Sequence, residues 1–390
     1  MKIVIAPDSF KGSVSAVEAA LAIERGILKA FPDFETVCLP IGDGGEGTLD
    51  TLVAATNGHT KAVRATGPLG QQIDAEYGIL GDNKTCVIEM ATASGLALVP
   101  EGQLNPLKAT TYGTGELIRH ALDSGYTSFI LALGGSATND GGVGMLQALG
   151  LKVLDENGNE IGQGGGELGK VHNIDMSELD PRIRTSTFLI ASDVENPLIG
   201  PNGASYVFGP QKGATLDIVK VLDNNLAHWG DCVEKASGVR LHELKGAGAA
   251  GGIGGAFQAF FPSKMRRGID VVIDHVDFHK TVNGADLVIT GEGQVDFQTA
   301  SGKTPMGVAQ AARSHDIPTI ILAGSVGAGV DVLYQYGIVS VNSIINRPMT
   351  LNEAMENAVE LIEFAAEQVV RSYFNDHKMQ QGKVVHYNEN

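Results

Sequence analysis

The chain has 390 residues, a formal net charge of −17 and 43% hydrophobic residues. Because a single hydrophobic core stops growing beyond about 250–300 residues, this length predicts two domains. The acidic balance argues against nucleic acid or an anionic membrane surface as a partner. The chain also has 51 glycines beside only 6% aromatic residues, which favours turns and backbone-lined binding loops.

The cysteines point to a reducing compartment. Cys38, Cys86 and Cys232 are widely separated and form no C-x-x-C pair, which argues against a disulfide framework and against a zinc site. The apolar run near the N-terminus is short and ends at Pro7, and no stretch reaches about 18 apolar residues. We therefore expect a cytoplasmic protein that is neither exported nor membrane-spanning.

The N-terminal part of the chain follows a strand–loop–helix pattern. A short apolar run at 2–6 indicates a buried parallel strand, and helical periodicity follows at 15–30. A second strand is expected at 36–41, and a short helix at 49–55. Residues 59–90 alternate in polarity and are broken by GPLG and GDN, which indicates antiparallel hairpins.

Strand–loop–helix units return further along the chain. The pattern predicts, in chain order, helix 115–124, strand 129–133, helix 144–149, strand 187–191, helix 215–237, strand 287–290, helix 306–314, strand 319–323, strand 340–344 and one long helix, 351–373.

The two chain ends resemble each other more than either resembles the middle. We therefore predict an α/β protein in which 1–62 and 285–375 form one discontinuous, doubly wound domain of flavodoxin or Rossmann type. Residues 63–284 are predicted to form a second, mixed α/β domain inserted in the first. The polar tail, 376–390, is expected to be flexible.

Polar residues follow the first predicted strand. The segment APDSFKGS offers Asp8, Ser9 and Lys11 at the carboxyl end of a parallel sheet, where open α/β sheets bind their ligands. Asp8 could accept a hydrogen bond from a substrate hydroxyl or hold a metal ion, and Lys11 could bind a carboxylate or a phosphate. A helix cap beside a surface lysine is the structural alternative.

Two acids follow the second predicted strand, in the segment GDGGEGT. Asp43 and Glu46 are three residues apart among four glycines. Glycines let a backbone approach a ligand closely, and paired carboxylates suit Mg²⁺ or a general base. A turn without a functional role is the alternative.

Two further segments follow strands predicted in the middle of the chain. The segment GGSATNDGG offers Ser136, Thr138 and Asp140 at a predicted phosphate-binding turn before a helix. The segment DVENPL offers Asp193 and Asn196, which suit metal or substrate oxygens, although an Asx-turn explains this pair equally well.

The last polar segment is GEGQVDFQTASGKTP. It is expected to place Glu292, Asp296 and Lys303 in one loop between a strand and a helix, which combines metal ligands with a cation that could neutralise phosphate. Lys212, in GPQKGA, lies on a further loop, and a solvated turn is at least as good an interpretation there.

Taken in order, APDSFKGS, GDGGEGT, GGSATNDGG, DVENPL, GPQKGA, GAGAAGG, GEGQVDFQT and GKTP resemble the bacterial glycerate kinase family of the type that forms 2-phosphoglycerate. The resemblance extends over residues 2–373. It implies ATP and Mg²⁺ as cofactors, D-glycerate as acceptor, and a flavodoxin-like domain built from both chain ends. The chain departs from the family at Gln294, where similar proteins often carry a basic residue.

Phosphoryl transfer requires in-line positioning, neutralisation of phosphate charge and a carboxylate that accepts the hydroxyl proton. We expect the site in the cleft between the domains, with the GGSATNDGG loop binding phosphate. The expected catalytic residues are Asp8, Lys11, Asp43 and Asp193; the expected substrate- and phosphate-binding residues are Ser9, Glu46, Ser136, Thr138, Asp140, Asn196, Glu292 and Lys303; the expected metal ligands are Asp193 and Asp296.

Other functions stay open on the sequence alone. One is a glycerate 3-kinase or a kinase of another small hydroxy acid, because the same arrangement serves any acceptor hydroxyl beside a carboxylate. A second, of another class, is a non-catalytic protein that binds a phosphorylated metabolite. The many acids at predicted strand ends argue against such an anion sensor. A homo-oligomer is also left open.

Overall fold

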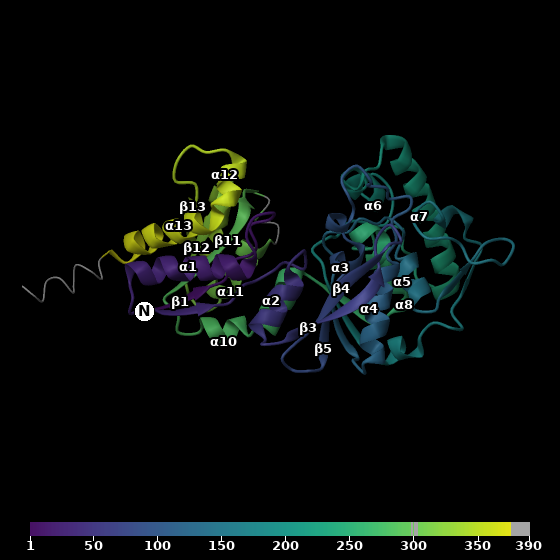
Figure 1. Ribbon diagram of the computed structural model, residues 1–390, viewed down its shortest axis with the longest axis horizontal. Helices are drawn as coiled ribbons and strands as arrows, with labels where there is room; N and C mark the ends of the chain where they lie inside the picture. The colour runs from purple at the N-terminus through teal and green to yellow at the C-terminus, as the bar shows by residue number, and fades with distance from the viewer. Residues whose placement is uncertain (298, 300–302, 376–390) are drawn as a thin grey trace, which may run out of the picture. The chain divides into compact units, whose positions relative to one another are not determined.

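A computed structural model describes residues 1–297, 299 and 303–375. The chain divides into two compact units (Figure 1). The first unit combines Met1–Gly42 with the chain from Val272 onward, and the second is Asp43–Val271. The domain bounds expected from the sequence, at 62/63 and 284/285, stay a prediction, and the tail 376–390 lies outside the described residues.

The described residues of the first unit form a parallel five-stranded sheet in the order β13–β12–β11–β1–β2. Counted along the first unit, this is the 2-1-3-4-5 order of flavodoxin-like doubly wound folds, which confirms the predicted fold class. The order reverses between β1 and β11, where such sheets bind their ligands. The strands are β1 (Lys2–Ile5), β2 (Glu35–Cys38), β11 (Leu287–Val295), β12 (Thr319–Val326) and β13 (Ile338–Ser343).

Helices cover both faces of this sheet. On one face α1 and α13 lie side by side (Figure 1), and a Cβ at Gly26 of α1 would lie 2.3 Å from the carbonyl oxygen of Glu363, so glycine permits their close approach. The helices of this unit are α1 (Ala16–Ala30), α10 (Phe278–Val282), α11 (Thr304–Arg313), α12 (Leu351–Glu356) and α13 (Ala358–Tyr373), with the 3₁₀ segment η7 (Val330–Tyr336).

Strand β12 shows why this sheet is buried on both faces. Ile320 and Leu322 belong to the core that includes α1 and α13. Ile321 and Ala323, on the opposite face, belong to a second core with α11 and η7. Because successive side chains point to opposite faces, an unbroken apolar run satisfies both layers of helices.

One sequence expectation is wrong here, because the predicted helix 351–373 is two helices. The break lies at Asn357, whose side-chain Nδ2 donates to the carbonyl oxygen of Glu353 over 2.7 Å. Such local side-chain bonds compete with the helical pattern. A capping box formed by Thr350 and Glu353 starts the first of the two helices.

The second unit is a mixed α/β structure. Its main sheet has the order β10–β9–β6–β5–β4–β3, with antiparallel pairs from β3 to β5, as the predicted hairpins required, and parallel pairs from β5 to β10. The strands are β3 (His59–Thr66), β4 (Gln72–Ile79), β5 (Thr85–Glu89), β6 (Ser128–Ala132), β9 (Thr187–Ala191) and β10 (Ser263–Arg266), with a separate pair β7 (Lys152–Leu154) and β8 (Asn173–Asp175).

The helices of the second unit are α2 (Thr48–Ala55), α3 (Ala91–Ser94), α4 (Tyr112–Asp123), α5 (Val143–Ala148), α6 (Ala204–Phe208), α7 (Leu216–Ser237) and α8 (Ile253–Phe260). Helix α9 (Gly268–His275) crosses the sequence division between the units. Among the described residues, no helix has the length and apolar character needed to cross a membrane.

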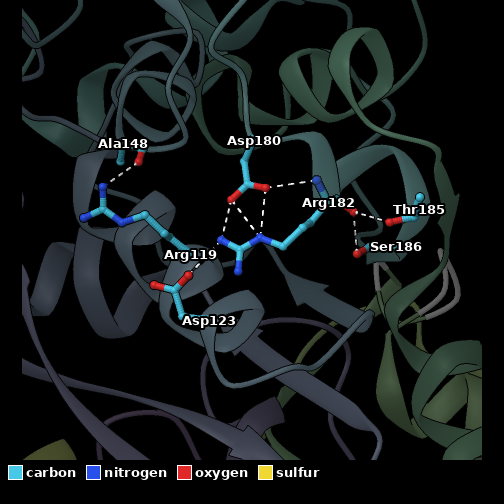
Figure 2. A network of polar contacts seen from close by, with 7 residues as sticks. All are labelled: Arg119, Asp123, Ala148, Asp180, Arg182, Thr185 and Ser186. Atoms are coloured by element: carbon cyan, nitrogen blue, oxygen red, sulfur yellow. Dashed lines mark hydrogen bonds and ion pairs between the residues drawn. The ribbon is translucent and has the colours of Figure 1, made fainter.

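Two arginines take part in a network of polar contacts in the second unit (Figure 2). Arg182 donates from Nε and Nη2 to the carboxylate of Asp180, and from Nη2 to Asp123 Oδ1 over 2.7 Å. Arg119 of α4 donates to the carbonyl oxygen of Ala148 in α5. Asp123 precedes β6 and Arg182 precedes β9, so this network lies at the edge of the sheet opposite to the strands' carboxyl ends.

Candidate functional site

The loop after β1 brings Asp8 to the point where the strand order reverses. The Asp8 N–H donates to the carbonyl oxygen of Gly291 in β11 over 2.8 Å. One carboxylate oxygen of Asp8 accepts from the Ser9 N–H over 2.6 Å, and the other accepts from the hydroxyl of Thr304, the first residue of α11. Contacts with the loop and with the helix thus orient the carboxylate.

Lys11 lies in a tight turn at 10–14 that packs against β11. Gly12 has φ +74°, a conformation that favours glycine. A Cβ at Gly293 would lie 3.4 Å from the Lys11 nitrogen, so the turn lies directly over the residue that follows Glu292. Lys11 is exposed to solvent. The exposed cation is therefore carried next to the acidic end of β11.

The carboxyl end of β11 carries a second set of charges. Lys303 Nζ lies 4.0 Å from Glu292 Oε2. The Thr299 hydroxyl donates to Glu292 Oε1 and accepts from the Asp296 N–H, over 3.2 Å in each case. Gln294 Nε2 donates to Asp296 Oδ2 over 3.3 Å. These contacts hold two carboxylates and one ammonium group near the N-terminus of α11.

This first cluster comprises the carboxylates of Asp8, Glu292 and Asp296 and the ammonium group of Lys303, and the backbone of Lys11 packs beside it at Gly293. Carboxylate oxygens are the ligands that Mg²⁺ takes in nucleotide sites, so the donor set fits this ion. A helix N-terminus beside cations attracts phosphate groups. The arrangement is suited to holding a metal-bound polyphosphate.

In the second unit, the GDGGEGT segment runs across the carboxyl ends of several strands. A Cβ at Gly44 would lie 2.8 Å from the carbonyl oxygen of Ala191 in β9, and a Cβ at Gly268 would lie 1.7 Å from the carbonyl oxygen of Asp43. The Gly134 N–H, just after β6, donates to the Gly44 carbonyl oxygen over 3.3 Å. Only glycine allows this close approach at Gly44 and at Gly268.

Glu89, which was not among the residues predicted from the sequence, holds the end of this segment through hydrogen bonds. Its carboxylate, 4% exposed at the end of β5, accepts from the N–H groups of Gly47 and Leu49 at the start of α2 over 3.1–3.2 Å. Burial raises the pKa of Glu89 to about 7, and the two backbone donors only partly oppose this. The one sequence feature that could have indicated Glu89 is its position as a single charged residue at the end of an apolar strand.

Replacing Glu89 with Gln is expected to reduce the pH dependence of stability. In the folded protein the pKa of Glu89 is raised from 4.5 to about 7. The contribution of the protonated Glu89 side chain to the free energy of unfolding is therefore fully present below about pH 4.5 and is lost as the pH rises through about 7. Between about pH 4.5 and about pH 7 the free energy of unfolding of the wild type should therefore fall by on the order of 3 kcal/mol, and that of the variant should not fall by this amount. Unfolding midpoints at about pH 5 and about pH 8 measure the difference; a gap between the two proteins that stays constant with pH would contradict the expectation.

Asp193 and Asp43 form an acidic pair at the end of β9. Asp193 Oδ1 accepts from the Gly268 N–H over 3.1 Å, and Asp43 Oδ1 accepts from the Gly45 N–H over 3.0 Å. Asp193 is accessible to solvent, yet protein atoms crowd its carboxylate. This crowding, with the nearby charge of Asp43, raises the pKa of Asp193 to about 7 although Arg267 opposes the shift. A carboxylate of this kind can accept a proton near neutral pH.

Asp140, in the GGSATNDGG loop, is an interior residue. Its carboxylate accepts from the N–H and the hydroxyl of Thr111, over 2.8 Å each, and from the N–H groups of Gly142 and Gly144. Burial raises the pKa of Asp140. A direct contact with substrate stays a prediction for this residue, and its internal hydrogen bonds favour a role in positioning the loop.

The same loop carries Ser136 and Thr138, both buried, and both contact Lys212. Lys212 is 1% exposed, so its interpretation as part of a solvated turn is wrong. Asn196 Nδ2 donates to the carbonyl oxygen of Asn202, and Glu46 is exposed.

The sequence-predicted residues thus fall into two groups. The first unit holds Asp8, Ser9, Lys11, Glu292, Asp296 and Lys303, and the second holds Asp43, Glu46, Ser136, Thr138, Asp140, Asp193 and Asn196. The predicted metal ligands, Asp193 and Asp296, belong to different units, and their joint role stays a prediction.

The model of the glycerate kinase family matches residues 3–374. The chain belongs to the glycerate kinase family. It is 53% identical to the glycerate kinase of Bacillus subtilis (strain 168), over 95% of this chain and 97% of the relative. It is 50% identical to the glycerate 2-kinase of Escherichia coli (strain K12), over 93% of this chain and 95% of the relative.

A solved structure from the same family agrees with the fold. It is a protein of Salmonella typhimurium LT2 provisionally assigned as glycerate kinase 2, which is 47% identical to this chain and superposes with a TM-score of 0.86. The similarity covers 97% of this chain and 99% of that one. Membership of the glycerate kinase family implies ATP-dependent phosphoryl transfer.

Proposed function

We propose that this protein is a glycerate 2-kinase, which transfers the γ-phosphoryl group of ATP to the carbon-2 hydroxyl of D-glycerate and releases ADP. The observation that carries the proposal is the 50% identity to the Escherichia coli glycerate 2-kinase over 93% of the chain. The charges at the carboxyl ends of the strands support it, because phosphoryl transfer depends mainly on positioning and charge neutralisation.

The cluster of the first unit is assigned to the phosphates of ATP. Lys303 and Lys11 supply positive charge, and the exposure of Lys11 leaves its ammonium group accessible to a ligand. Glu292 and Asp296, each oriented through Thr299, are the residues that would hold Mg²⁺. When bound, this ion neutralises charge on the phosphate oxygens.

The acidic pair of the second unit is assigned to the acceptor. The carbon-2 hydroxyl oxygen of glycerate forms a bond to the γ-phosphorus while the bond between this phosphorus and the bridging oxygen of ADP breaks. The hydroxyl proton passes to the Asp193 carboxylate, whose raised pKa suits a base at neutral pH. Asp43 sustains this pKa through its charge. Ser136 is assigned to substrate binding, while Thr138, which is fully buried, accepts from Lys212 through its carbonyl oxygen. The three free cysteines support a cytoplasmic location.

Phosphorus NMR of the product made from D-glycerate, ATP and Mg²⁺ tests the proposal. We expect a single new phosphomonoester, 2-phosphoglycerate, formed with ADP, and loss of turnover when a chelator removes Mg²⁺. Formation of 3-phosphoglycerate would support the alternative 3-kinase. If no glycerate ester forms, a screen of other hydroxy acids by ADP release distinguishes another kinase from a protein that only binds a phosphometabolite.

A further inference from the structure

Lys212 is a charged residue in the interior of the second unit. It ends the 3₁₀ segment η4 (Pro210–Lys212), and only 1% of its surface is exposed. Its Nζ atom donates to Ser136 Oγ over 2.8 Å and to the Thr138 carbonyl oxygen over 2.6 Å. Burial lowers the pKa of Lys212 to about 7, and the charge of Asp140 opposes this shift. A buried lysine costs stability unless its contacts repay the loss of hydration, so a functional reason for its position is expected.

The contact with Lys212 determines what the Ser136 hydroxyl can do. A hydroxyl has one proton to donate and lone pairs that accept. When Lys212 is protonated, its ammonium group has no acceptor, so Ser136 Oγ accepts from it and the serine proton remains available to another oxygen. Ser136 retains 7% of its exposed surface, whereas Thr138 beside it has none.

The loop around Ser136 contains further polar atoms and touches the GDGGEGT segment. Thr138 Oγ1 and Asn139 Oδ1 are buried and make no hydrogen bond within the described chain, although buried polar groups are normally bonded. At the start of the loop, a Cβ at Gly134 would lie 2.4 Å from the Cα of Gly45. A displacement of this loop would therefore reach the segment that carries Asp43.

We propose that Lys212 is a positioning residue for phosphoryl transfer: it orients the Ser136 hydroxyl as a donor to an anionic oxygen of a substrate. This inference rests on the proposed function and deepens it, since the oxygen belongs either to the carboxylate of glycerate or to a phosphate of ATP. Lys212 itself, being enclosed by protein, acts through Ser136.

A double-mutant cycle of Lys212→Met and Ser136→Ala tests this role. If Lys212 acts through Ser136, each single variant lowers kcat/KM by about 10- to 100-fold, and the double variant is no worse than the poorer single one. The substrate whose KM rises identifies the oxygen. A higher KM for D-glycerate indicates its carboxylate, and a higher KM for ATP indicates a phosphate. Lys220→Met, on the exposed face of α7, is the matched control and should leave activity unchanged.

Thermal unfolding of each variant separates loss of function from loss of fold. If Lys212→Met does not fold, Lys212→Gln replaces it, because an amide keeps a donor for Ser136 without the charge and should retain more activity than the methionine variant. Multiplicative losses in the double variant, or normal kinetics in folded Ser136→Ala, would overturn the inference. A wild type that does not phosphorylate glycerate would instead contradict the proposed function, and the cycle would then use the acceptor that it does phosphorylate.

Discussion

Replacement of Asp193 with Asn is expected to lower kcat by about 10²- to 10⁴-fold, the range usual for loss of a general base. The substitution keeps the size of the side chain and an oxygen for the Gly268 N–H, but it removes the site that accepts the hydroxyl proton. Steady-state rates with D-glycerate and ATP measure the effect. Asp217→Asn, an exposed change in α7, is the matched control.

The pH dependence of kcat/KM is an independent test of Asp193 as the general base. Because Asp193 must be ionised to accept a proton and its pKa is raised to about 7, kcat/KM should increase as the pH rises through about 7. The charge of Asp43 contributes to this shift, so Asp43→Asn should move the acidic limb to lower pH. An Asp193→Asn variant that folds and turns over at a near-normal rate would exclude Asp193 as the base. An acidic limb that stays in place in Asp43→Asn would show that the pair is not coupled.

The fold was largely predictable because apolar runs and glycine-rich breaks mark the strands of a doubly wound sheet. The limits of β1, β6 and β9 were predicted to within a residue. Strand β11 was expected to end at residue 290, yet it continues to Val295, so Glu292 lies in a strand that pairs with β12 and not in a loop. Its two glycines, 291 and 293, argue for a loop by propensity, but pairing with β12 overrides that local preference.

The candidate site was only partly predictable. Asp8, Asp43 and Asp193 could be proposed because each follows a predicted strand, and strand direction places such residues at the carboxyl edge of its sheet. Glu89 and Lys212 were missed or misread, because their roles depend on burial and on partners that are distant in sequence, 42 residues away for Gly47 and 76 for Ser136. No local pattern distinguishes an interior lysine from one in a solvated turn.

After Asp193, Lys303 is the residue whose replacement is expected to lower kcat most. Replacement with Met should lower kcat by about 10²- to 10³-fold, the cost of removing one group that stabilises developing charge. Its ammonium group lies 4.0 Å from Glu292 and next to the N-terminus of α11. Lys303→Arg, which keeps the charge but changes its geometry, should fall between the wild type and Lys303→Met.

The kinetic pattern decides whether Lys303 acts on the transition state or only on binding. A group that neutralises charge as the phosphoryl group moves should affect kcat, whereas a group that only binds ATP should raise the KM for ATP and leave kcat unchanged. Lys280→Met, an exposed lysine of the same unit, controls for loss of a surface charge. If Lys303→Met raised only the KM for ATP, Lys303 would be a binding residue, and the charge on the transferred group would have to be neutralised by Lys11 and by the metal ion that Glu292 and Asp296 are proposed to hold.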